Sequence, residues 1–184
     1  ESFYKSLCTA ELGAVLDTLK YLKHETAVWF EITTLLIPDE NDSPAEIDAM
    51  TQWIRENLGP DVPVHFTAFH PDYRMRNKPR TPPRTLIQAW RIARENGIRY
   101  VYTGNIYDKP TGSTYCHNCG LRLIGRDWHL LDEWGLTQSG LCSRCGTPCA
   151  GEFEDHPGDW GRKRQPVRLE DFAARLPRDA EVSA

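Results

Sequence analysis

Four of the six cysteines in this sequence of 184 residues form two Cys-x-x-Cys pairs, each followed directly by glycine. Two intervening residues let one tight turn direct both thiolates at a single ion, and the glycine permits the left-handed backbone of such a turn. The two pairs are separated by 22 residues, close to the spacing of four-cysteine zinc ribbons. We expect a closed, structural Zn²⁺ site with iron in a rubredoxin-like site as the alternative, its ligands being Cys116, Cys119, Cys142 and Cys145.

The segment around these pairs, residues 111–156, is rich in cysteine, glycine and turn-forming residues and has no long helical pattern. It predicts a small separate module, in which Cys149, His117 and His129 stay outside the metal shell. The paired spacing favours metal binding over disulfides. The tail at 157–184 is polar and basic, and its apolar spacing predicts one short helix at 167–176.

Composition narrows the class of protein. With 40% hydrophobic and 26% charged residues, the chain fits one globular domain with a small appendage. Its formal net charge of −4 argues against a general nucleic-acid binder, whose affinity would come mainly from neutralised phosphates. No apolar run approaches the roughly 20 residues of a membrane-spanning helix, and the first residues are no signal peptide. We expect a soluble, cytoplasmic protein that does not contact a membrane.

Helical and strand patterns alternate in the part of the chain before the cysteines. The run at 28–37 is almost entirely β-branched, aromatic or aliphatic and is stopped by Pro38, which predicts a strand buried on both faces. Ser43, Pro44 and Glu46 form a helix start, and Gly59 ends that helix. The full prediction is helix 10–24, strand 28–37, helix 43–59, strand 63–69, helix 83–96 and strand 98–103.

This αβαβαβ order predicts three adjacent parallel strands with helices packed against both faces. Three strands are too few to close a barrel, since the usual closed form has about eight. We therefore expect the sheet to be incomplete and the chain to be a fragment of a longer protein, as its start at Glu1 rather than methionine also suggests. A self-sufficient small α/β domain is the alternative.

Polar residues follow each predicted strand, at 38–42, 70–73 and 104–105. The carboxyl ends of parallel strands share one rim, where ligands gather. Glu31 lies inside an apolar strand and therefore needs a partner, either in a pocket or in an ion pair. Of His65 and His70, only His70 is at the ligand-bearing end. The segment 72–99 has eight basic residues against two acids, so it is either a solvated surface or a site for an anionic partner or a polypeptide substrate.

Several motifs together carry a resemblance to a known family. The stretches EITTLLIPDENDS, HFTAFHPDYRM, YVYTGN, TYCHNCG and LCSRCGTP occur in this order between residues 31 and 148. They resemble the carboxyl-terminal half of the radical S-adenosylmethionine (SAM) enzymes of the AmmeMemoRadiSam system, which are similar to pyruvate formate-lyase activating enzyme. The family has a partial (β/α)₆ TIM-type barrel, and it holds a [4Fe-4S] iron-sulfur cluster through a Cys-x-x-x-Cys-x-x-Cys motif that is absent here.

The resemblance implies that residues 1–110 are the carboxyl-terminal half of a radical SAM partial barrel and that 111–156 form an appended zinc ribbon. The partner of this half would be the missing amino-terminal half of the barrel. Thr33-Thr34 stand where the closest activating enzymes have a basic residue. The implied SAM-binding residues are Glu31, Thr33, Ile37, Asn41, Asp42 and His70.

The implied activity is that of an oxidoreductase of the glycyl-radical-activating type. The intact protein would cleave SAM reductively to a 5′-deoxyadenosyl radical, which abstracts hydrogen from a substrate that could be a protein. The chain alone, without cluster ligands, would be inactive. The alternative is a zinc-ribbon binding module that recognises a protein or a nucleic acid.

Overall fold

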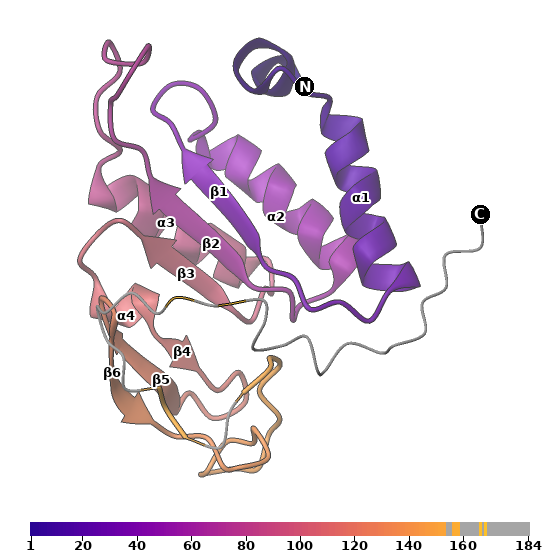
Figure 1. The fold of residues 1–184 in the computed structure, drawn as a ribbon, viewed down its shortest axis with the longest axis vertical. Helices are drawn as coiled ribbons and strands as arrows, with labels where there is room; N and C mark the ends of the chain where they lie inside the picture. The colour runs from indigo at the N-terminus through magenta and orange to yellow at the C-terminus, as the bar shows by residue number, and fades with distance from the viewer. Residues whose placement is uncertain (154–155, 159–165, 167, 169–184) are drawn as a thin grey trace.

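The computed structural model describes residues 1–153, 156–158, 166 and 168, so the helix predicted at 167–176 falls outside the described residues. A parallel sheet with helices comes first, and a smaller antiparallel sheet follows it (Figure 1). The elements are η1 (Tyr4–Cys8), α1 (Leu12–Glu25), β1 (Ile32–Leu36), α2 (Pro44–Leu58), β2 (Val64–Ala68), α3 (Pro83–Glu95), β3 (Val101–Gly104), α4 (Lys109–Gly112), β4 (Thr114–Tyr115), β5 (Arg122–Asp127) and β6 (Leu130–Trp134). No described helix is long and apolar enough to cross a membrane.

The first sheet has the strand order β1-β2-β3, and both pairings are parallel. Ile32 lies opposite Val64, which in turn lies opposite Val101. The predicted αβαβαβ order and the three adjacent parallel strands are therefore confirmed. All three strands end at the same rim, as short right-handed crossovers require.

The start of α2 follows directly from its sequence. The Ser43 hydroxyl accepts a hydrogen bond from the Glu46 N–H at 3.3 Å, and Pro44 occupies the first turn, where no N–H is needed. Gly59 ends the helix with a φ of +86°, a conformation that costs glycine little. These local signals fix where the helix begins and ends.

The main core lies between the sheet and the helices α2 and α3. Val64, Phe66 and Ala68 point from β2 into this core, where they meet Ile54 of α2 and Leu86 of α3. Helix α1 is more peripheral, because none of its residues is fully buried. Burial of these apolar side chains is the main stabilisation of the sheet.

The prediction of a strand buried on both faces is wrong. The strand begins at Ile32 rather than Val28, and its burial alternates, with Thr33 and Leu35 exposed. Helices α2 and α3 share one core against one face of the sheet (Figure 1). The prediction that helices pack against both faces is therefore also wrong. An apolar run does not reveal whether a second layer packs on the other face of its sheet, and here no helix does.

The second sheet has the order β4-β5-β6, and both pairings are antiparallel. Its middle strand has a register shift between Gly125 and Arg126, which is typical of a β-bulge. A separate hydrophobic cluster supports this sheet and contains the buried Leu123, Ile124 and Leu136. We call the segment from β4 to residue 153, with both cysteine pairs, the ribbon.

Candidate metal centre and sheet rim

The two Cys-x-x-Cys turns have the same backbone geometry. In the first turn the Gly120 N–H donates to the Cys116 carbonyl at 3.0 Å, and in the second the Gly146 N–H donates to the Cys142 carbonyl at 2.8 Å. Each leading cysteine also donates its own N–H to the carbonyl five residues later. Both glycines have a φ of +71°, which other residues rarely adopt. The predicted role of these glycines is thus confirmed.

The four thiol groups converge between the two turns. The Sγ atoms of Cys116 and Cys145 are 3.6 Å apart, as are those of Cys119 and Cys142. All four sulfur atoms lie within 4.8 Å of one another. A tetrahedral ion with bonds of about 2.3 Å to sulfur would separate its ligands by about 3.8 Å. The four cysteines therefore form a cluster that could bind a metal such as zinc.

Hydrogen bonds around the cluster favour at least one thiolate. The Thr147 hydroxyl and its backbone N–H lower the pKa of Cys145 to about 5. The pKa of Cys119 is raised instead, to about 11: the Leu121 N–H favours its thiolate, but desolvation and the three neighbouring thiols outweigh that bond. A divalent cation would relieve this crowding, because it stabilises all four thiolates together.

Neighbouring candidate ligands lie outside this cluster. The group of candidate metal ligands among the described residues consists of the four cysteines and includes neither Cys149, His117 nor His129. The Cys149 thiol is buried next to the Tyr100 hydroxyl, and burial raises its pKa. Four sulfurs close a tetrahedral shell, so the cluster suits structure rather than catalysis.

The ribbon is packed directly on the parallel sheet. Tyr100, which precedes β3 and accepts the Val64 N–H through its carbonyl, belongs to the hydrophobic cluster of Cys116 and Cys142. Its hydroxyl accepts a hydrogen bond from the Ala150 N–H at 3.0 Å. One residue of the sheet edge thus also helps to build the core of the ribbon.

The predicted rim is present at the carboxyl ends of β1, β2 and β3. Asn105, after β3, donates its side-chain N–H to the Ala68 carbonyl at 3.3 Å and accepts from Arg80 through its own carbonyl at 2.8 Å. Asp39, Tyr73 and Asn105 have φ values of +64°, +44° and +60°, one at each strand exit. Such conformations are uncommon for residues other than glycine and often occur at functional sites.

Two of the predicted SAM-binding residues have a structural role in the first exit turn. The Asn41 side chain accepts the Ile37 N–H at 2.8 Å and donates to the Leu35 carbonyl at 3.0 Å. Asp42 accepts the Asp39 N–H at 3.0 Å. Ile37 is buried, and the exposed His70 follows β2 on the same rim. Ile37, Asn41, Asp42 and His70 are therefore brought together at one end of the sheet.

The other two predicted residues lie elsewhere. Glu31 immediately precedes β1, at the amino end of the sheet, and its carboxylate binds His65 Nε2 at 2.6 Å and Trp29 Nε1 at 3.2 Å. Thr33 is exposed on the face without helices. A strand of five residues spans roughly 16 Å, so Glu31 is far from the rim. Its predicted need for a partner is met by His65.

Sequence reasoning missed Thr81, which is fully buried. Its hydroxyl accepts the Phe69 N–H at 2.9 Å and donates to the Leu36 carbonyl, and so links the exits of β1 and β2. Thr81 lies in a loop rich in proline and arginine that has no periodic pattern. A threonine between proline-rich segments was the only signal.

No protein-family model matches the chain, and no solved structure matches it. The chain is similar to Uncharacterized protein MJ0808 of Methanocaldococcus jannaschii, with 42% identity over 124 residues. The matched stretch covers 67% of this chain and 37% of that protein. The chain thus spans well under half the length of this archaeal relative.

Proposed function

We propose that this chain is the carboxyl-terminal part of a radical SAM enzyme similar to pyruvate formate-lyase activating enzyme. In this proposal its parallel sheet contributes to SAM binding and to substrate positioning, and its ribbon holds a structural Zn²⁺. The sheet needs an amino-terminal half that supplies the [4Fe-4S] ligands, because the six cysteines of this chain include no Cys-x-x-x-Cys-x-x-Cys.

The observation that carries the proposal is the face of the parallel sheet that no helix covers, against which the ribbon packs at Tyr102 of β3. Parallel strands occur almost only where both faces are covered, yet helices α2 and α3 cover only one face here. The other face presents Thr33, Leu35, His65, Thr67 and Tyr102, none of them fully buried. A barrel has its helices outside and the other face of its strands turned inward, and this sheet has its helices on one face only.

The rim at the carboxyl ends of β1, β2 and β3 is a second observation that supports SAM binding. Three strand exits come together there, each with one residue at positive φ, and ligand sites of barrels lie at this end. Asn41 and Asp42 shape the first exit loop, which would present backbone groups to a nucleoside. The exposed His70 is the side chain best placed to contact it directly. Bound SAM would supply the radical chemistry, and these residues would hold and orient it.

The test is SAM cleavage by the full reading frame that contains this chain. That protein, loaded anaerobically with iron and sulfide and reduced, should form 5′-deoxyadenosine from SAM. The change His70→Ala should reduce the rate by about tenfold, the size of one lost contact of roughly 1.4 kcal/mol. A frame without a Cys-x-x-x-Cys-x-x-Cys motif upstream would rule the proposal out.

The 184-residue chain by itself provides the matched control. It should neither cleave SAM nor carry four irons per chain, since the cluster ligands are absent. A single iron per chain would instead indicate a rubredoxin-like ribbon. The expected metal is one zinc.

A second candidate is a binding module in which the ribbon recognises a protein or a nucleic acid. The exposed Trp128, Leu130 and Leu131 around the β5–β6 turn favour it, because exposed apolar clusters often mark interaction sites. A full-length protein that binds a partner through this turn but forms no 5′-deoxyadenosine would support this candidate over the enzyme.

A further inference from the structure

A pocket of about 570 Å³ lies between the open face of the parallel sheet and the ribbon. His65 and Tyr102 line it from the sheet, and Ile124, Arg126 and Trp134 line it from the ribbon. The volume falls within the range of small-molecule sites, about 300–1,000 Å³. Of the rim residues, Asn105 after β3 lines this pocket, whereas Ile37, Asn41, Asp42 and His70 do not. The pocket therefore reaches the rim only at the exit of β3 and does not include the four rim residues proposed to bind SAM.

The wall of this pocket is held in place on both sides. The His65 ring lies 4.9 Å from the Tyr102 ring, and the Glu31 carboxylate fixes its orientation from the other side. The Arg126 guanidinium lies over the Tyr102 ring, 5.3 Å from its centre. The Tyr102 hydroxyl bonds to Thr114 at 2.9 Å. A binding wall that is already ordered loses little entropy when a ligand binds.

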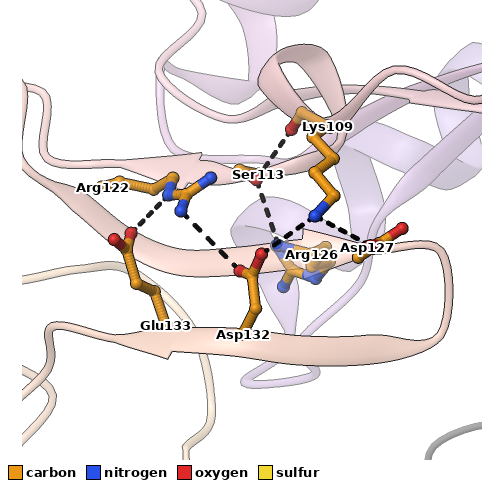
Figure 2. Close-up of polar contacts among 7 residues, drawn as sticks. All are labelled: Lys109, Ser113, Arg122, Arg126, Asp127, Asp132 and Glu133. Carbon is orange, nitrogen blue, oxygen red and sulfur yellow. Dashed lines mark hydrogen bonds and ion pairs between the residues drawn. The ribbon is translucent and has the colours of Figure 1, made fainter.

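Arg126 differs from two neighbouring cations, Lys109 of α4 and Arg122 of β5, as Figure 2 shows. Lys109 pairs with Asp127 at 2.8 Å and with Asp132 at 3.4 Å, and Arg122 pairs with Glu133 and Asp132. Within the described part of the chain, no carboxylate lies within 4.0 Å of the Arg126 guanidinium. This positive charge is half-buried, and a partly desolvated charge without a counter-ion is costly.

The guanidinium also has donors to spare. Its Nη1 donates to Thr114 Oγ1 at 2.7 Å and to the Gly112 carbonyl at 3.5 Å. No hydrogen bond from its Nε or Nη2 occurs among the described residues. Three acids line the pocket wall. Glu31 binds His65 and Asp108 accepts from Thr111, and Glu152 forms no ion pair with Arg126 among the described residues. The Nε–Nη2 edge matches the bidentate geometry of a carboxylate.

We propose that this pocket binds a small organic acid, with Arg126 as the residue that takes the carboxylate and the aromatic wall as the surface that takes a planar, apolar body. Aromatic rings with one placed charge are a common composition of small-molecule sites. The site needs both the sheet and the ribbon, because Tyr102 and Arg126 come from different sheets.

In the experiment the zinc-loaded chain is titrated with benzoate, phenylacetate and indole-3-acetate. Calorimetry measures binding of all three acids, and tryptophan fluorescence measures binding of the two acids that have no indole. The lining tryptophans Trp29, Trp128 and Trp134 should report binding. At least one acid should bind saturably, and its neutral amide should bind about tenfold more weakly, because the charge-assisted bond to Arg126 is lost.

The variant Arg126→Gln should weaken binding of that acid about tenfold or more, and Arg126→Lys should weaken it less. The charge-matched control Arg91→Gln, an exposed position on α3, should leave it unchanged. Unchanged zinc content and far-UV circular dichroism show that a variant is folded. Failure of all three acids to bind at about 10 mM, or equal binding by folded Arg126→Gln, would overturn the proposal. Tighter binding of inorganic phosphate than of any acid would also overturn the carboxylate assignment.

Discussion

Thr81 links the exits of two neighbouring strands through one buried hydroxyl group. It bonds to Leu36, the last residue of β1, and to Phe69, the first residue after β2. Asn41 has a similar role in the first exit turn, where its amide joins Leu35 to Ile37. At the scale of single residues, polar side chains replace backbone ladders at the rim and so fix the shape of the loops there.

The change Thr81→Ala should lower the free energy of unfolding by about 1–3 kcal/mol, because it leaves a buried N–H and a buried carbonyl without partners. Thr81→Ser, which keeps the hydroxyl group, should cost clearly less. Urea unfolding of both variants measures the difference. Equal losses in the two variants would show that the methyl group, and not the hydroxyl, matters at this position.

Cys142 is the most buried of the four clustered cysteines, at 1% exposure. The change Cys142→Ser should reduce bound zinc from about one per chain to near zero, since a closed site needs all four thiolates. The ribbon should then become sensitive to protease while the helical signal of α1 to α3 largely remains. Metal analysis and limited proteolysis test this.

Cys8→Ser is the matched control, because Cys8 is exposed and outside the cluster. It should retain full zinc and full protease resistance. A well-folded wild-type chain with no metal, or with a disulfide between Cys116 and Cys119, would show that the four cysteines do not form a metal site.

At the scale of elements, the β5–β6 hairpin depends on a glycine in β5, the middle strand of the second sheet. A Cβ atom at Gly125 would lie 2.9 Å from the Glu133 Cβ and 2.1 Å from an Asp132 carboxylate oxygen. The carboxylate can move away, but the Glu133 Cβ is fixed by the paired strand. The register shift at Gly125 therefore brings the two strands too close for any other residue.

The change Gly125→Ala should destabilise the ribbon by about 1–3 kcal/mol, the usual cost of overpacking. Gly13→Ala in α1 should have the opposite sign, a gain of roughly 0.5–1 kcal/mol, because no atom lies within 4 Å of the new Cβ and alanine favours helix. Thermal unfolding of the two variants compares them. A neutral Gly125→Ala would show that the hairpin can change its register.

At the scale of the whole molecule, the sheet and the ribbon meet at Tyr100 and Tyr102. Burial raises the pKa of both phenols above the usual range, against the hydrogen bond that Tyr100 accepts from Ala150 and that Tyr102 shares with Thr114. The junction is therefore built around two neutral phenols, and its stability depends on their staying protonated.

Above about pH 10 the unfolded chain loses its tyrosine protons while the folded chain retains those of Tyr100 and Tyr102. The unfolded state then binds fewer protons, so stability is fully present below this pH and falls as pH rises above it. Urea unfolding between about pH 8 and pH 11 should show a smaller loss for Tyr100→Phe than for the wild type. Parallel pH profiles would show that this phenol does not contribute to the alkaline loss.

The sequence by itself determined the features that depend on local spacing. Cys-x-x-Cys-Gly sets the geometry of each turn, Ser43 caps its helix, and the αβαβαβ order leads to adjacent parallel strands. These follow from short-range hydrogen bonding and periodicity, which are properties of a few consecutive residues.

Only the tertiary structure decided which face of the sheet is covered and which polar groups meet. The pairing of Glu31 with His65, the links made by Thr81 and the unpaired charge of Arg126 all join segments distant in the sequence. The sequence of an apolar strand also does not show whether helices pack on one face of its sheet or on both, so the exposed face could not be foreseen. Side-chain partners across elements depend on packing, and packing is not encoded in any local pattern.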